Sequence, residues 1–153
     1  MSDENLEHFP DFTKSVIIDA PVAEVWKTIT VPVLMQKWLF DDKVKVTVDW
    51  QVGGIITIEV LEHWVLSTAS GKVLKIKPEK LLQYTQLSSL SRLPDEPKNH
   101  CVLEFDLTPI EKDKTQLNFT ASNFPTESIH KHMVFYWFTT VDIIKESVEK
   151  SIK

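Results

Sequence analysis

Few residues in this chain have types and a spacing that suit catalysis, and Glu62 is the foremost of them. It follows Ile56, Ile58 and Val60 at steps of two, so in a β-strand its side chain would share their inward face. A carboxylate that is buried without a partner is costly, and such groups often mark a functional site. The alternative is a strand end or bulge that turns Glu62 and His63 towards solvent.

Tyr84 is the second polar candidate, because its ring could hydrogen-bond a ligand or simply close the core. Glu62, His63 and Tyr84 are the only side chains that could form an acid–base set. An enzyme typically has at least two titratable groups that converge on one pocket. This sequence has only one such candidate, Glu62, and its orientation is ambiguous. Binding is therefore favoured over catalysis, and no catalytic residue is assigned.

The other reactive side chains have structural explanations. His130 and His132 are two residues apart on a predicted helix, so they face different directions and make a poor metal site. His100 and Cys101 lie on opposite faces of a predicted strand, and a lone cysteine is usually a small buried residue. The sequence has no glycine-rich phosphate loop. We expect neither a metal nor a cofactor.

Large rings are the remaining candidates for a binding site. Five Trp and eight Phe are many for this length, and such rings either fill a core or line a ligand pocket. Met133 lies on the predicted last helix and suits an adaptable pocket wall. The expected ligand-binding set is Trp38, Phe40, Trp50, Trp64, Tyr84, Phe105, Met133 and Trp137, with Glu62 as its possible polar group.

The composition indicates one soluble globular domain over residues 1–153, of which 1–11 are expected to be a flexible N-terminal segment. The net charge of −5, with mixed signs along the chain, disfavours a nucleic-acid partner. Cys101 has no cysteine to pair with, and the acidic N-terminus is unlike a signal peptide. No apolar run is long enough to span a membrane. A cytoplasmic location is expected.

Changes in hydrophobic period divide the chain into elements. Residues 13–18 predict a strand, and Pro21 and Pro32 begin two short helices that end near Phe40. From Val44 the period becomes two, and strands are expected at 44–50, 56–64, 73–77, 81–87, 101–107 and 117–121. Residues 67–70 and 88–99 are expected to be loops.

The last segment predicts a helix of about 25 residues near Glu127 to Lys150, capped by Thr126 or Ser128. Such a helix is roughly 38 Å long and could cross the whole sheet. The predicted fold is α+β, with a curved antiparallel sheet of six to seven strands under this helix. Because one helix cannot fill every inward position of so wide a sheet, rings must fill the flanks or a pocket is left, open near the short helices.

Several short sequence motifs resemble those of a known family. They are Ile18-Asp19-Ala20-Pro21 with Val25-Trp26, Pro32 with Lys37-Trp38-Leu39, Gly53-Gly54, Gly71-Lys72-Val73-Leu74 with Ile76 and Pro78, Leu82 with Tyr84-Thr85, and Thr115 with Leu117. Their order resembles the helix-grip fold of the START-like (SRPBCC) superfamily, in the branch named for the activator of the 90-kDa heat-shock protein ATPase. The sequence departs from the branch in having no Gly-Trp before the final helix segment, since Trp137 follows Tyr136.

The resemblance implies three competing functions. We favour non-enzymatic binding of a small hydrophobic or amphipathic molecule in a cavity between the sheet and the last helix. The first alternative is a protein–protein interaction module related to the chaperone ATPase activators, with a part in stress response. The second is a cyclase- or hydrolase-like enzyme that uses Glu62, His63 and Tyr84. The chaperone activators also have a separate chaperone-binding domain, for which this chain leaves no room, so the branch name is not an activity.

Overall fold

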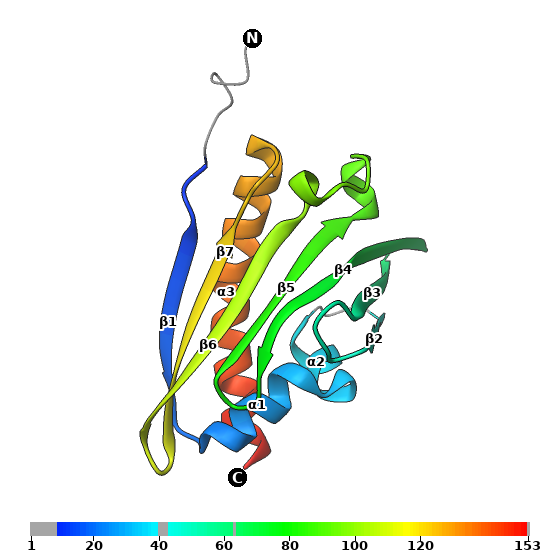
Figure 1. Cartoon of the computed structure of the whole chain (residues 1–153). Coiled ribbons are helices and arrows are strands. Elements are labelled where there is room, and N and C mark those ends of the chain that lie inside the picture. Colours follow the sequence, from blue (N-terminus) through cyan, green and yellow to red (C-terminus); the bar gives the residue numbers. More distant parts are fainter. Residues whose placement is uncertain (1–8, 40–42, 63, 153) are drawn as a thin grey trace.

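A seven-stranded antiparallel sheet curves around one long helix (Figure 1). The computed structural model describes residues 9–39, 43–62 and 64–152. The strands are β1 (Phe12–Ile18), β2 (Lys43–Val48), β3 (Ile55–Glu62), β4 (Val65–Lys77), β5 (Leu81–Ser88), β6 (Cys101–Glu111) and β7 (Lys114–Ser122). The helices are α1 (Val22–Thr30), α2 (Pro32–Leu39) and α3 (Glu127–Ser151), with two 3₁₀ turns, η2 (Ser89–Ser91) and η3 (Pro97–Asn99). The strand order is β1-β7-β6-β5-β4-β3-β2, which confirms the predicted fold class.

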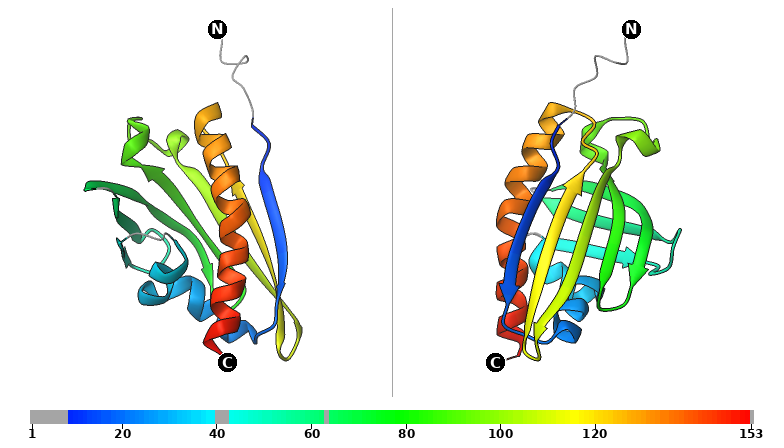
Figure 2. Two further views of the ribbon diagram at one scale, coloured as in Figure 1. Left: turned by 180° about the vertical axis from the view of Figure 1, so that it is seen from behind. Right: turned by 60° about the vertical axis from the view of Figure 1, so that its left-hand side comes forward.

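Two prolines set the start of the short helices. Pro21 is extended and precedes the first residue of α1, whose apolar stripe buries Val25 and Ile29. Pro32 begins α2 directly afterwards, because proline suits a first turn in which its missing N–H would have no partner. Figures 1 and 2 show both helices beside α3, and the end of α2 reaches Tyr136 and Trp137 of that helix.

The alternation of the strands decides which side chains face inward. In β6 and β7 the odd-numbered residues from Cys101 to Leu107 and from Thr115 to Ala121 are buried. In β4 the register shifts between Val73 and Lys75, so a bulge moves the inward parity from odd to even residues. The bulge bends the sheet, and the curvature makes room for α3.

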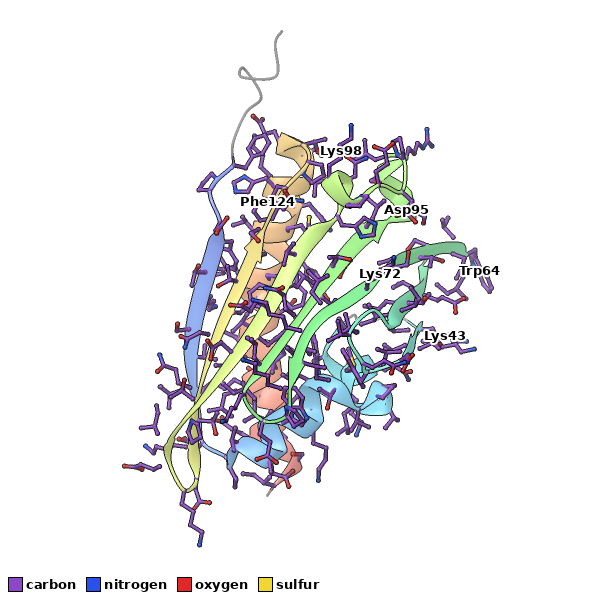
Figure 3. All side chains as sticks on the ribbon, in the orientation of Figure 1. Lys43, Trp64, Lys72, Asp95, Lys98 and Phe124 are labelled. Carbon is purple, nitrogen blue, oxygen red and sulfur yellow. The ribbon has the colours of Figure 1, made fainter. Side chains whose placement is uncertain are left out.

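Two details of the β3–β4 region differ from the sequence expectation. Residues 67–70 are not a loop, because β4 starts at Val65 and its Ala69 pairs with Ile58 of β3. Trp64 does not continue the inward face of β3: its φ of 67° places it in the turn between β3 and β4, with 93% of its surface exposed. Figure 3 shows Trp64 at the outer end of this hairpin, away from α3.

The helix α3 covers the concave face of the sheet, as predicted. The Thr126 hydroxyl accepts a hydrogen bond from the Ile129 N–H at 3.1 Å, which identifies Thr126 as the N-cap. The inner stripe contributes five fully or nearly buried side chains: Met133, Trp137, Val141, Ile144 and Val148. Among the described residues, no helix is both long enough and apolar enough for a membrane crossing.

The edge strand β1 ties α3 to the sheet. The Lys14 ammonium donates to the Asp142 carboxylate at 2.7 Å and lies 4.1 Å from the centre of the Phe138 ring. Lower on the helix, Lys145 donates to the Ile17 carbonyl oxygen at 2.7 Å. At the chain's start, residues 1–8 of the expected flexible segment lie outside the described residues, and Phe9 stacks on His130 with ring centres 5.3 Å apart.

Candidate functional site

A pocket of about 410 Å³ lies between the N-terminal half of α3 and the upper part of the curved sheet. This volume is within the ordinary range for small-molecule sites. Its walls come from the end of α2, from β3, β4 and β5, from the start of β6, from the 88–99 segment and from the first three turns of α3. The lining residues are Leu39, Ile58, Val60, Ser67, Ala69, Gln86, Leu87, Ser88, Leu90, Ser91, Asn99, Cys101, Ser128, Ile129, His132, Met133, Tyr136 and Trp137.

The pocket exists because three of the inward side chains at this end of the sheet, those of Ala69, Ser88 and Cys101, are small. Ala69 of β4 pairs with Ser88 of β5, and Gln86 of β5 pairs with Cys101 of β6. None of these four side chains carries a ring that could reach α3. Because protein interiors pack to nearly constant density, a run of small side chains under a helix leaves space unless the backbone closes it.

The opposite end of the same strands is filled. Tyr84 stacks on Phe105 with ring centres 6.0 Å apart, and Phe105 meets Phe119 edge-on at 5.1 Å. Trp38 of α2 closes this cluster from the side, 6.5 Å from Phe105. The inner face is therefore divided into a packed aromatic half and an open half.

The apolar wall of the pocket is fixed by both helices. Met133 and Trp137 project from α3, and Leu39 is the last residue of α2. The Tyr136 hydroxyl donates a hydrogen bond to the Leu39 carbonyl oxygen, which fastens the end of α2 to α3. Ile58 of β3 supplies the floor.

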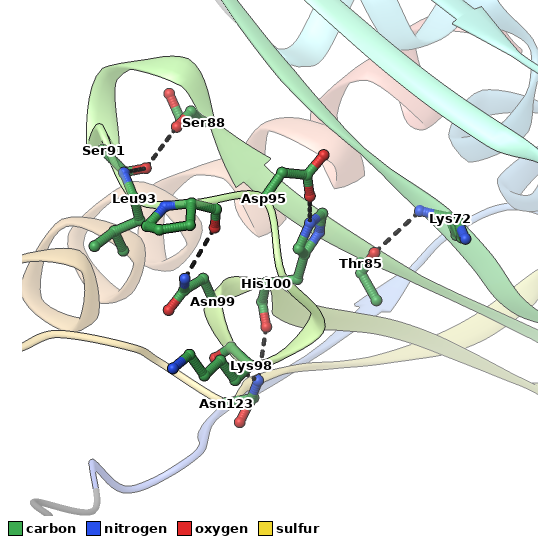
Figure 4. A network of polar contacts seen from close by, with 11 residues as sticks. Lys72, Thr85, Ser88, Ser91, Leu93, Asp95, Lys98, Asn99, His100 and Asn123 are labelled. Carbon is green, nitrogen blue, oxygen red and sulfur yellow. Dashed lines mark hydrogen bonds and ion pairs between the residues drawn. The ribbon is translucent and has the colours of Figure 1, made fainter.

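The polar wall is built from the segment between β5 and β6, which hydrogen bonds hold in shape (Figure 4). Ser88 caps η2 by accepting from the Leu90 N–H at 3.1 Å, and the Ser91 hydroxyl donates to the Ser88 carbonyl at 2.7 Å. The Asn99 amide donates to the Pro94 carbonyl oxygen at 2.9 Å. Ser88, Ser91 and Asn99 line the pocket, and these hydrogen bonds hold their side chains in place.

Two hydrogen bonds close the base of this segment. The His100 Nε2 lies 2.6 Å from the Asp95 Oδ1, and the Asn123 amide donates to the His100 carbonyl at 2.8 Å (Figure 4). His100 itself is turned away from the pocket, because its neighbour Cys101 takes the inward position. The 88–100 segment is thus a preformed wall.

The described walls of the pocket carry no fixed charge, because none of the described lining side chains is Lys, Arg, Asp or Glu. Burial raises the pKa of the Cys101 thiol to about 12, so this group is a neutral part of the wall rather than a nucleophile. The Gln86 amide makes no hydrogen bond within the part of the chain that the structure describes, so its donor and acceptor are available to a ligand.

The predicted ligand-binding residues are divided between pocket and core. Met133 and Trp137 line the pocket. Trp38, Tyr84 and Phe105 lie in the packed half with at most 2% of their surface exposed.

Two of the predicted tryptophans are fixed to α1 by hydrogen bonds. The indole N–H of Trp38 donates to the Thr28 carbonyl oxygen at 2.9 Å, and that of Trp50 donates to the Thr30 carbonyl oxygen at 2.6 Å. Trp64 is the exposed turn residue noted above, and it is absent from the lining of the pocket. Phe40, His63 and the side chain of Glu62 lie outside the described residues.

The backbone separates the members of the acid–base set considered above. Tyr84 of β5 pairs with Val73 of β4, two residues from Gly71, which pairs with Ile56 of β3. Across the sheet, Tyr84 is therefore nearly level with Ile56. Glu62 is six residues further along β3, which corresponds to about 20 Å at 3.3 Å per residue. Burial, with a smaller contribution from Tyr136, raises the pKa of Tyr84, so its phenol stays protonated. Tyr84 and Glu62 are therefore not brought to one site.

Sequence reasoning missed the small and polar lining residues. The sequence pattern predicts loops at 67–70 and 88–99, which include Ser67, Ala69 and Ser88, and it assigns no role to Gln86. The spacing of the residues indicates the inward orientation of Gln86 and Ser88, because they continue the two-residue step of Leu82 and Tyr84 along the strand. His132, considered in the sequence analysis only as a poor metal ligand, lies at the edge of the pocket beside Tyr136. Within the described residues, no cluster of three His, Cys, Asp or Glu could hold a metal ion.

Solved structures share this architecture. ChR145 from Cytophaga hutchinsonii is 26% identical, with a TM-score of 0.78 over 96% of this chain and 99% of that one. NE0264 from Nitrosomonas europaea is 25% identical, with a TM-score of 0.73 over 92% of this chain and 95% of that one. DynU16, described as a protein in the dynemicin biosynthetic locus, is 18% identical, with a TM-score of 0.72 over 92% of this chain and 48% of that one. Because DynU16 is only 18% identical, its similarity to this chain shows a shared fold and no more.

A family model gives the identification. Among curated proteins no match was found. Residues 19–149, which include α1, α2, all strands but β1 and nearly all of α3, match the model of the Activator of Hsp90 ATPase homolog 1-like protein. The match extends over most of the chain and agrees with the helix-grip arrangement of its sheet and terminal helix. The chain therefore belongs to the Activator of Hsp90 ATPase homolog 1-like family.

Proposed function

We propose that this protein binds a small amphipathic molecule in the pocket between α3 and the sheet, without catalysing its conversion. The observation that carries the proposal is the preformed pocket of about 410 Å³, which has one apolar and one polar wall. Ligand sites of this size are typically lined by apolar groups with a few polar groups that fix orientation.

The walls specify the chemistry of the ligand. An apolar body would lie against Leu39, Ile58, Met133 and Trp137, where its burial would contribute about 25 cal/mol for each Å² removed from water. A polar end would lie against the β5–β6 side, where the free Gln86 amide offers one donor pair and one acceptor. Because none of the described lining residues carries a fixed charge, a neutral or weakly acidic molecule fits better than a strongly ionic one.

The proposal includes a cytoplasmic location. A role in stress response would follow only if the ligand or a partner connects the protein to a chaperone, and the pocket itself does not require one.

Native mass spectrometry of freshly purified protein tests for a co-purified ligand, and a thermal-shift screen of fatty acids, flavonoids and sterols tests for binding. A compound at 100 times its dissociation constant adds about 2.7 kcal/mol to stability by mass action, which raises Tm by several degrees. We expect at least one apolar compound with a polar end to do so. No bound mass and no shift with any compound would overturn the proposal.

A pair of variants locates the binding. Ala69→Phe places a ring in the pocket and should abolish the shift produced by any compound found in the screen. Ser70→Phe, one residue along β4 on the opposite face and outside the pocket lining, is the matched control and should leave the shift unchanged. A shift that survives Ala69→Phe would place the binding elsewhere.

A further inference from the structure

The side of α3 that faces away from the sheet carries two exposed phenylalanines. Phe135 has 79% of its surface exposed and Phe138 has 59%. With Val134, they line an apolar surface groove of about 390 Å³ between His130 and Thr139. No described helix or strand lies over this side of α3 (Figure 2). Two side chains reach its edges: the Lys14 ammonium of β1 lies 4.1 Å from the centre of the Phe138 ring, and Phe9 stacks on His130. Large apolar side chains grouped on a surface commonly mark an interface.

The charges on this side follow a symmetrical order. Lys131, Phe135, Phe138 and Asp142 are separated by steps of four, three and four, so they form one stripe, here called the α3 outer face. A cation stands at one end, an anion at the other, and the two rings lie between them. The midpoint between Phe135 and Phe138 is also the midpoint between Lys131 and Asp142.

From this pattern we propose that the α3 outer face binds a second copy of itself, with the two α3 helices antiparallel about a twofold axis at that midpoint. Phe135 then packs against the partner's Phe138, and Lys131 meets the partner's Asp142, twice by symmetry. Along the helix, Lys131 and Asp142 lie about 8 Å on opposite sides of the axis. The twofold rotation therefore places each Lys131 opposite the partner's Asp142, within reach of the lysine side chain. A parallel arrangement would instead place like charges together.

The neighbouring contacts are compatible with this pairing. Lys14 already holds one Asp142 oxygen at 2.7 Å and leaves the other for a second cation. Lys131 makes only an exposed pair with Glu127 at 3.1 Å, and such pairs contribute little. Glu127 and Glu146 lie a further turn from the axis, where crossing helices diverge, so their repulsion is weak.

The pairing would leave the ligand pocket open. The α3 residues that line the pocket and those that line the outer groove have no member in common, because they occupy different sides of the helix. The inference therefore does not depend on the proposed function. An interface of one helix from each copy is at the small end of the biological range, so the dimer should be reversible.

Sedimentation velocity over a concentration series is the test. We expect the weight-average sedimentation coefficient of the native chain to rise from the monomer value towards the dimer value. Phe135→Glu should raise the dimer dissociation constant at least about 30-fold, the loss typical of a central contact residue. Val33→Glu, which alters an exposed apolar residue on α2, is the control and should have no effect. A native chain that is monomeric throughout, or a dimer unaffected by Phe135→Glu, would overturn the proposal.

A charge exchange tests the register. Lys131→Glu and Asp142→Lys each place like charges opposite one another and should weaken self-association. A mixture of the two variants restores both attractive pairs, so it should dimerise more strongly than either variant alone. Because Asp142→Lys also removes the partner of Lys14, the Tm of each monomer is measured in parallel. Failure of the mixture to recover dimer, with both monomers folded, would exclude the antiparallel register.

Discussion

Phe119 of β7 and Trp137 of α3 stack with their ring centres 4.4 Å apart and their planes 23° from parallel. The contact joins the terminal helix to the centre of the β1-β7-β6 side of the sheet. Trp38 approaches Trp137 to 6.3 Å from the other side, so elements from both ends of the chain meet at one ring. The same ring forms part of the pocket wall.

Trp137→Ala should therefore be strongly destabilising. Only 1% of the Trp137 surface is exposed, and removal of a buried tryptophan ring costs about 3–5 kcal/mol. The control is Val33→Ala on α2, which shortens a side chain with 60% of its surface exposed and should change stability by no more than about 0.5 kcal/mol. Urea titration measures both. A loss below about 1 kcal/mol for Trp137→Ala would show that the ring does not hold α3 on the sheet.

Gly71 allows β4 and β5 to approach closely. A Cβ atom at Gly71 would lie 1.8 Å from the Thr85 carbonyl oxygen, so Gly71→Ala should force the strands apart and cost about 3 kcal/mol or more. Gly53→Ala provides the comparison, because its Cβ would meet no atom within 4 Å and only its φ of 86° is unfavourable. That substitution should cost about 1–2 kcal/mol. Equal losses for the two variants in thermal denaturation would contradict the steric explanation.

The two tyrosines of the chain should respond oppositely to loss of their hydroxyl groups. The Tyr84 hydroxyl is buried and has no hydrogen-bond partner among the described residues, so Tyr84→Phe should stabilise the fold by about 1 kcal/mol. The Tyr136 hydroxyl donates to the Leu39 carbonyl, so Tyr136→Phe should cost about 1 kcal/mol. Chemical denaturation of both variants measures the difference. A destabilised Tyr84→Phe would indicate that the hydroxyl has a partner.

Alkaline pH should weaken the fold through Cys101. Burial raises the pKa of the native thiol from 9.0 to about 12, so between these values the unfolded chain has lost a proton that the native chain retains. Stability then falls by about 1.4 kcal/mol for each pH unit from this group alone. The Cys101→Ala variant has no thiol, so its stability lacks this dependence on pH. The difference in unfolding free energy between the native chain and the variant should therefore be constant below pH 9 and shrink above it. Urea titrations on both sides of pH 9 test this, and a difference that does not change with pH would show that the thiol is solvated.

Local patterns were sufficient for much of the fold. The stripe from Met133 to Val148 predicted both the length of α3 and its buried side, because helical spacing alone decides which residues share a face. The change to a period of two after Val44 predicted the antiparallel sheet, and Pro21 and Pro32 predicted two short helices. These features depend on residues within about one turn or one strand of each other.

The sequence by itself thus determined the elements, their order and most of their inward faces, whereas the tertiary structure decided the pocket. Ala69, Ser88 and Cys101 come from three strands, and only the register of β4, β5 and β6 places them together beneath α3. Ser67 and Ala69 lack the β-branched or aromatic character of a typical strand, and their pairing with β3 overrides that weak local preference. The sequence also left open which rings would face a cavity, because filling a core and lining a pocket require the same residue types. That choice depends on the space left between α3 and a sheet bent at the Val73–Lys75 bulge.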